Sequence, residues 1–217
     1  MCEAIEDCIV IMETISRLPQ NFYKQFEELL FGYQFDETDA QGYRTKGFKT
    51  YNGNVHGECQ GWYEDGSLKY ICNYEDGEYN GRYRWWYEEG GNLECEGYYV
   101  NGNEHGNFKR WYEAKRSEAT GEYENGEILS DENYNEGKKD GVCRLWFPNK
   151  QIKFQLNYTE DKLHGNAKWW FENGQLWRNE NYNESRRHGK CVEWYPNGKL
   201  RYYVFYDNNH LDQNINI

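Results

Sequence analysis

Six glycines, each with a tryptophan at a constant distance, constrain this chain more than any other feature of its sequence. Successive glycines lie 24, 25, 35, 24 and 24 residues apart, and a Trp follows each of them by five residues. The tryptophans are Trp62, Trp86, Trp111, Trp146, Trp170 and Trp194, and the glycines are Gly57, Gly81, Gly106, Gly141, Gly165 and Gly189. Self-similarity at this period is typical of a repeat protein, in which each unit is one supersecondary element stacked on the next.

Each repeat predicts a β-hairpin. An aromatic residue follows every Trp, and most repeats continue with a turn sequence such as EDG at 64–66 or PNG at 196–198. A second strand then closes on a fixed tyrosine, which is Tyr74, Tyr99, Tyr134, Tyr158, Tyr182 or Tyr206. Asp-Gly and Asn-Gly between alternating segments are strong hairpin signals. We therefore expect a mainly β fold, a single-layer twisted antiparallel meander of six hairpins.

The 35-residue interval is a normal repeat with an insertion. Trp111 and the turn before Gly141 keep their spacing, so the extra residues fall at 113–123, at the tip of the first hairpin of that repeat. Insertions in repeat proteins map to loops on one side, which is often a binding side.

Strand alternation predicts one apolar and one polar face. The apolar face carries the aromatic residue after each Trp, beside rows such as Cys143, Leu145 and Phe147. The polar face carries the Trp row, with basic residues two positions earlier at Arg84, Lys109, Arg144 and Lys168. Across the turns we expect Trp62, Trp146 and Trp194 to face Lys69, Lys153 and Arg201. Cys59 should lie opposite Cys72, as two reduced thiols in preference to a disulfide.

The pattern HG-x4-W-Y-x2-G-x-L-x5-Y-x2-G resembles the MORN repeat, in the variant found in bacterial antitoxin-type proteins and in MORN-repeat proteins of large DNA viruses. The resemblance covers about residues 51–211, and the chain departs from the pattern in its inserted third repeat. It implies a MORN-like solenoid that acts as a scaffold, adaptor or tether.

The N-terminal residues have a different period. Residues 2–17 predict a helix with Ile5, Cys8, Ile9, Met12 and Ile15 on one face, ended by Pro19, and residues 20–31 predict a second helix. We expect 1–31 to be a helical cap on the first unpaired strand, 32–53 degenerate lead-in strands, 54–211 the six repeats and 212–217 a tail. A docking helix pair that resembles the start of an F-box at Leu18 and Pro19 is the alternative.

Composition and charge restrict the partners. The chain has 37 acidic and 25 basic residues, a net charge of −12, which disfavours nucleic acid and anionic membranes as main partners. The stretch Cys8–Met12 is too short to span a membrane, and acids precede it, so neither a signal peptide nor a transmembrane segment is expected. Seven cysteines without a CxxC pair favour an intracellular, reducing location, in the cytoplasm or, for a viral protein, in host cytoplasm or virion.

No motif in the sequence predicts catalysis, a cofactor or a metal. The chain has no HExxH, GxSxG or P-loop sequence. The recurring His56, His105, His164 and His188 belong to different repeats, and equivalent positions of consecutive repeats are already about 9.6 Å apart in a flat ladder, too far to share one zinc ion. We interpret them as turn residues.

The sequence therefore predicts a non-enzymatic scaffold for protein–protein interaction, with a structural role in a large DNA virus particle as a specific case. A membrane or phosphoinositide tether and an antitoxin-like inhibitor are the alternatives. A Trp row with basic residues suits an acidic peptide better than single-stranded nucleic acid in so acidic a protein. A residual apolar groove would bind a partner or a second copy of the chain. The candidate partner-binding residues are the six tryptophans of the row together with Leu145, Phe147, Trp169 and Phe171.

Overall fold

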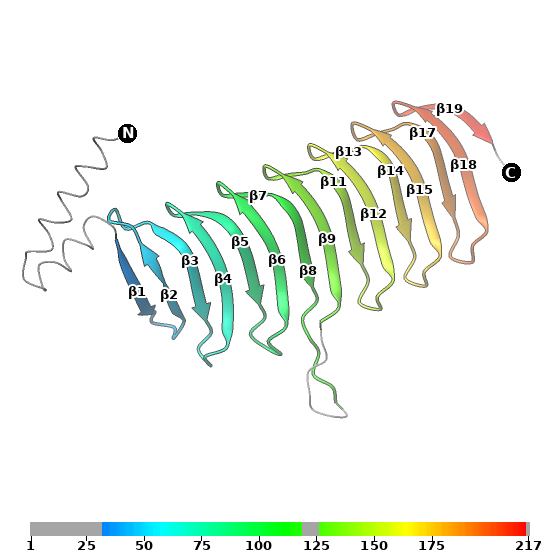
Figure 1. Cartoon of the computed structure of the whole chain (residues 1–217). Helices are drawn as coiled ribbons and strands as arrows, with labels where there is room; N and C mark the ends of the chain where they lie inside the picture. The colour runs from blue at the N-terminus through cyan, green and yellow to red at the C-terminus, as the bar shows by residue number, and fades with distance from the viewer. Residues whose placement is uncertain (1–31, 119–125, 216–217) are drawn as a thin grey trace, which may run out of the picture.

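The protein forms one long, open antiparallel sheet in a computed structural model that describes residues 32–118 and 126–215 (Figure 1). The strands are β1 (Tyr33–Thr38), β2 (Arg44–Lys49), β3 (Val55–Trp62), β4 (Leu68–Glu75), β5 (Glu78–Trp86), β6 (Leu93–Val100), β7 (Asn103–Glu104), β8 (Gly106–Trp111), β9 (Ile128–Asn135), β10 (Lys138–Lys139), β11 (Gly141–Trp146), β12 (Ile152–Thr159), β13 (Lys162–Leu163), β14 (Gly165–Trp170), β15 (Leu176–Asn183), β16 (Arg186–Arg187), β17 (Gly189–Trp194), β18 (Leu200–Asp207) and β19 (His210–Ile215). The predicted fold class is confirmed. The predicted helical cap at 1–31 and residues 119–125 of the insertion lie outside the described residues.

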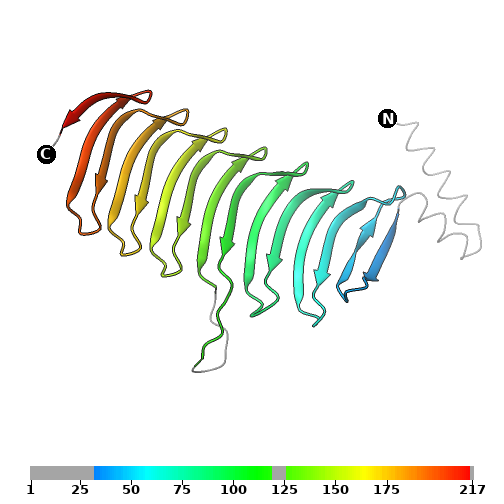
Figure 2. The ribbon, with the colours of Figure 1, turned by 180° about the vertical axis from the view of Figure 1, so that it is seen from behind.

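The hairpins follow one another in chain order, so the sheet grows by two long strands per repeat. The long strands β6 and β8, β9 and β11, β12 and β14, and β15 and β17 pair between repeats. Both views show bowed strands in a single layer (Figures 1 and 2). At the C-terminal end β19 continues to Ile215, into the segment expected to be a tail, because it pairs with β18.

The expected pairing of three tryptophans with basic residues across the turns is wrong, although Arg44 on β2 lies 5.0 Å from the Trp62 ring. Trp62 faces Leu68, Trp146 faces Ile152 and Trp194 faces Leu200, because the register shifts just before each Trp. A β-bulge places two residues of one strand against one residue of the other. The bulge moves each cation onto the aromatic residue after the Trp. Lys69 lies 5.2 Å from the Tyr63 ring, Lys153 5.5 Å from the Phe147 ring and Arg201 5.8 Å from the Tyr195 ring.

The core is a row of side chains at the strand centres on the apolar face. Cys59 lies opposite Cys72, as predicted, and both are free thiols. The row consists of Phe35, Cys59, Cys72, Phe108, Cys143, Leu156, Ala167, Cys191 and Val204, none more than 7 % exposed. With no second layer among the described residues, this burial comes from neighbouring side chains on the same face.

Hydrogen bonds at the turn edge hold successive repeats together. The hydroxyl of Tyr63 donates to the carbonyl of Trp86 at 2.7 Å, and Tyr87 and Tyr112 make the same bond to the next Trp at 3.0 and 2.9 Å. Where this residue is Phe, an asparagine in the turn makes the hydrogen bond to the next repeat instead. In the repeat of Phe147, Asn149 donates to the carbonyl of Glu172 at 2.9 Å. The aromatic residue after the Trp is thus a structural part of the stack.

The opposite edge is held by two-residue turns. In each, both central residues have positive φ, and the second is glycine in the early repeats but Asp161, Ser185 or Asn209 later. These side chains accept a hydrogen bond from the preceding repeat, as when the Asp161 carboxylate accepts from the Lys139 N–H at 2.8 Å. The extra bond offsets the cost of a left-handed residue.

Replacing Asp161 with alanine is expected to lower the free energy of unfolding by about 1–2 kcal/mol. The variant loses one hydrogen bond and tolerates the left-handed backbone less well than Asp. Asp161→Gly loses the same bond but gains backbone freedom, so it should cost less. Urea unfolding followed by Trp fluorescence measures both, and an equal or larger loss for the glycine variant would contradict this explanation.

Candidate interaction surfaces

The Trp row lies on the polar face, and three of the four predicted basic residues beside it stand next to acids. All six tryptophans are half-buried. Arg84 lies 3.5 Å from Glu96 and Arg144 lies 3.7 Å from Asp131, while Lys109 stands between Glu96 and Asp131 in the strand register. Charges alternate in sign from Arg84 on β5 to Arg144 on β11, whereas Lys168 on β14 stands between the uncharged Gln155 and Asn179. The row therefore presents less free positive charge than the sequence suggested.

The other predicted site residues come together on the apolar face. Leu145 on β11 pairs with Phe154 on β12, and Phe154 pairs with Trp169 on β14. Phe147 and Phe171 follow at the turn edge of the same repeats, and all five side chains are half-buried. We call Leu145, Phe147, Phe154, Trp169 and Phe171 the apolar patch. Sequence reasoning named four of these residues and missed Phe154, which the strand alternation would have placed beside Leu145.

Two ionic clusters border the apolar patch in the same row of side chains. On the N-terminal side Arg110 lies 2.5 Å from Glu132 and 3.4 Å from Glu104, and Lys139 also reaches Glu132 at 2.5 Å. Burial raises the pKa of Glu104 above its usual value, against the opposing effect of Arg110. This cluster is closely balanced in charge.

The cluster on the C-terminal side is built on two buried carboxylates. Glu180 is 1 % and Glu193 3 % exposed. Arg178 lies 3.1 Å from Glu193, Arg187 lies 3.4 Å from Glu180, and Arg201 also bonds to Glu193. Burial alone would raise the pKa of Glu193, but hydrogen bonds from Arg178, Tyr202 and Arg201 outweigh it and lower that pKa. Three partly exposed guanidiniums against two carboxylates leave this cluster positive.

A comparison with protein-family models matches four stretches of the chain. The family is the MORN repeat variant, and the matched residues are 55–76, 139–160, 163–184 and 187–208. The chain is a MORN-repeat variant protein. A search of the curated proteins finds no match to it.

The described residues between the first and second matches, 77–118 and 126–138, form the same hairpins as the MORN repeats around them. They include the hairpins that end their first strands at Trp86 and Trp111, with the bulge before the Trp in each. Their sequence differs at the core position, where Gly97 lies under the Phe108 ring, and in the insertion. MORN architecture therefore continues from the first to the last matched repeat.

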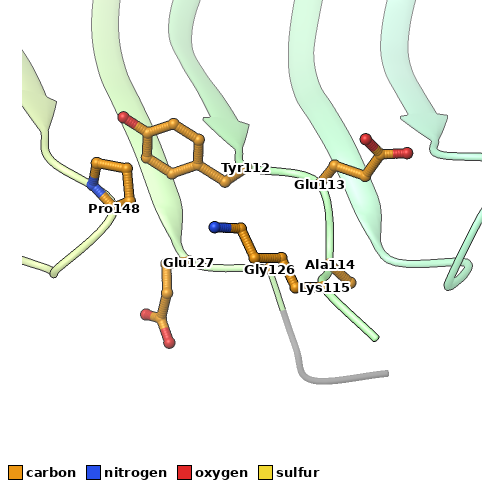
Figure 3. A pocket seen from close by; sticks show the side chains of 7 residues that line it. All are labelled: Tyr112, Glu113, Ala114, Lys115, Gly126, Glu127 and Pro148. Atoms are coloured by element: carbon orange, nitrogen blue, oxygen red, sulfur yellow. The ribbon is translucent and has the colours of Figure 1, made fainter. Parts of the chain in front are cut away.

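A cavity of about 370 Å³ lies at the foot of the insertion (Figure 3). Tyr112 and Pro148 form its apolar walls, and Glu113, Lys115 and Glu127 bring charges of both signs. The Glu127 carboxylate is held by Lys150 at 2.7 Å. Because the lining is mixed in charge and the Glu127 carboxylate is already paired with Lys150, the cavity does not indicate a class of ligand.

The described residues hold neither a metal cluster nor a membrane-spanning helix. Within 32–118 and 126–215 no group of three or more His, Cys, Asp and Glu side chains could hold a metal ion. His56 lies 3.7 Å from Asp76 and His188 3.3 Å from Asp207, each beside a turn. In the same ranges no helix has the length and apolarity needed to cross a bilayer.

Proposed function

We propose that this MORN-repeat protein is a non-enzymatic scaffold that binds a protein partner at the apolar patch. The observation that carries the proposal is the continuity of Leu145, Phe154 and Trp169 across β11, β12 and β14. These side chains are only half-buried, and among the described residues the sheet has a single layer. Contiguous apolar surface bordered by polar residues is typical of protein interaction sites.

The chemistry of the patch also favours a protein partner. Interface cores are enriched in aromatic residues and depleted of charge, and their rims are polar. Four of the five side chains in the patch are aromatic, and Arg178 follows Trp169 in the register. A partner segment that is apolar on one face and acidic at its edge fits this arrangement.

We also propose a more specific role, that of a structural or virion-associated protein of a large DNA virus acting inside the host cell. This role rests on the resemblance of the repeats alone. The five described cysteines are free and largely buried, which supports a reducing location. Affinity capture from a relevant host cell tests the role, and recovery of particle components would support it. Recovery of no reproducible partner would count against it.

Replacing Leu145 with glutamate is expected to remove at least nine-tenths of partner capture, because a carboxylate in the centre of an apolar contact loses its hydration. The matched control is Gln155→Glu, which adds the same charge in the same hairpin on the polar face, where Arg144 already bonds to Gln155 at 3.1 Å. Capture with mass spectrometry compares the two. Equal retention of partners by Leu145→Glu and the control would overturn the patch as the binding site, provided that both variants unfold at the wild-type urea midpoint.

A further inference from the structure

The chain carries opposite charge on the two sides of residue 139, and we call residues 1–138 the negative half and residues 139–217, which are fewer, the positive or C-terminal half. Residues 139–217 hold 12 Lys and Arg against nine Asp and Glu, whereas residues 1–138 hold 13 against 28. The positive half contains the apolar patch and the cluster of Arg178, Arg187 and Arg201. An acidic segment is therefore attracted to the face that exposes the patch.

The N-terminal segment of the chain has the complementary chemistry. Residues 1–31 carry six acidic residues against Arg17 and Lys24. If residues 2–17 form the helix that their spacing predicts, Ile5, Ile9 and Met12 share one face and the acids Glu3, Glu6, Asp7 and Glu13 lie around it. An apolar stripe edged by carboxylates fits an apolar patch edged by guanidiniums.

We propose that residues 2–17 of one copy dock on the apolar patch of a second copy. The inference rests on the proposed function, since it names an occupant for the same patch. Lys153, which is exposed over Phe147, and the positive cluster at Arg178, Arg187 and Arg201 would pair with the acids of the incoming helix.

The length of the N-terminal segment favours docking on a second copy over docking on the same chain. Eight long-strand steps separate β1 from β11, and ten separate it from β14, so the patch lies roughly 40–50 Å along the sheet at about 4.8 Å per strand. If residues 18–31 are largely helical, residue 17 lies no more than about 22 Å from residue 32 at about 1.5 Å per residue. Residue 2 then lies no more than about 45 Å from residue 32, so only the N-terminal tip of the helix reaches β11 of its own chain, and β14 stays uncovered.

Reciprocal docking closes into a dimer. Two elongated sheets placed antiparallel bring the N-terminal segment of each copy to the C-terminal half of the other, which is a two-fold arrangement with two identical contacts. It also opposes the negative half of one copy to the positive half of the other at both ends. Closed symmetry explains how an open sheet could associate without growing into a filament.

The oligomeric state of the full chain tests the proposal by sedimentation equilibrium at 50 and 500 mM salt. We expect a dimer that Leu145→Glu and Ile9→Glu each convert to a monomer, with a dissociation constant raised at least tenfold. Thr14→Glu adds the same charge on the opposite side of the predicted helix and should leave the dimer intact. High salt should weaken the wild-type dimer, because the charged contacts are screened.

Mixing the two monomeric variants gives the decisive readout. The Ile9→Glu chain keeps an intact patch and the Leu145→Glu chain keeps an intact N-terminal segment, so the mixture should form a heterodimer with one contact. A wild-type chain that is monomeric at high concentration, a dimer insensitive to both variants, or a mixture that stays monomeric would overturn the proposal. Partner capture distinguishes self-docking from the proposed function. If the wild type is monomeric but Leu145→Glu still abolishes partner capture, the patch remains the partner-binding site and only the self-docking is refuted.

Discussion

Replacing Glu193 with glutamine is expected to lower the free energy of unfolding by about 2–3 kcal/mol, although the side chain keeps its shape. Glu193 is 3 % exposed and bonds to Arg178 and Arg201 on two neighbouring strands. Breaking a fully buried pair costs about 3–5 kcal/mol, because the partner charge stays desolvated. The cost here is smaller, since Arg201 is 53 % exposed and can regain water.

The pH dependence provides a second readout of the same carboxylate. The pKa of Glu193 is lowered in the folded protein by its hydrogen bonds to Arg178, Tyr202 and Arg201, against the effect of burial. A lowered pKa contributes stability that is present above the unfolded value of about 4.3 and is lost as the pH falls through the folded value. The difference between wild type and Glu193→Gln should therefore narrow from pH 5 to pH 3 in urea unfolding experiments.

Glu172→Gln is the matched control, because Glu172 is exposed in a turn of the preceding repeat and its change should cost less than about 0.5 kcal/mol. A constant difference between wild type and Glu193→Gln across that pH range would show that the cost comes from packing and not from charge.

The repeat period predicted most of the fold. Constant spacing of Trp and Tyr determined the number of hairpins, and a period of two along the strands was enough to place Cys59 opposite Cys72. The bulge before each Trp was missed, because strict strand alternation was extended through the Trp to the turn. Gly66, Gly174 and Gly198 adopt positive φ in longer turns, and such turns are commonly followed by a bulge.

The candidate site was predicted in part. Hydrophobicity located Leu145, Phe147, Trp169 and Phe171, because large apolar residues recur there at strand spacing. The buried carboxylates were missed, since charged residues are normally assigned to the surface. Glu180 falls at the same strand position as Leu156, and that alignment was the available signal. Arg84 and Glu96 face each other within one hairpin, but the contact of Arg144 with Asp131 joins two repeats and is not encoded in a single repeat sequence.

Adding a methyl group at Gly97 is expected to destabilise the middle of the sheet by about 2–3 kcal/mol, the upper range for overpacking a core. A Cβ atom at Gly97 would lie 2.3 Å from the Phe108 ring, which is 1 % exposed. The ring cannot turn away freely, because Tyr99 and Tyr134 pack edge-on against it at 5.3 and 5.6 Å. Phe108→Ala alone should cost about 3–5 kcal/mol through the cavity that it leaves.

A double-mutant cycle separates the steric clash from any other effect of the alanine. In the Phe108→Ala background the space above Gly97 is open, and alanine is favoured over glycine in a strand by about 0.5–1 kcal/mol. Gly97→Ala should then be neutral or stabilising, which gives a coupling energy of about 2–4 kcal/mol between the two sites. Urea unfolding of the four proteins measures it. Additive costs would mean that the Phe108 ring does not occupy the space over Gly97, and the packing described for this repeat would be wrong.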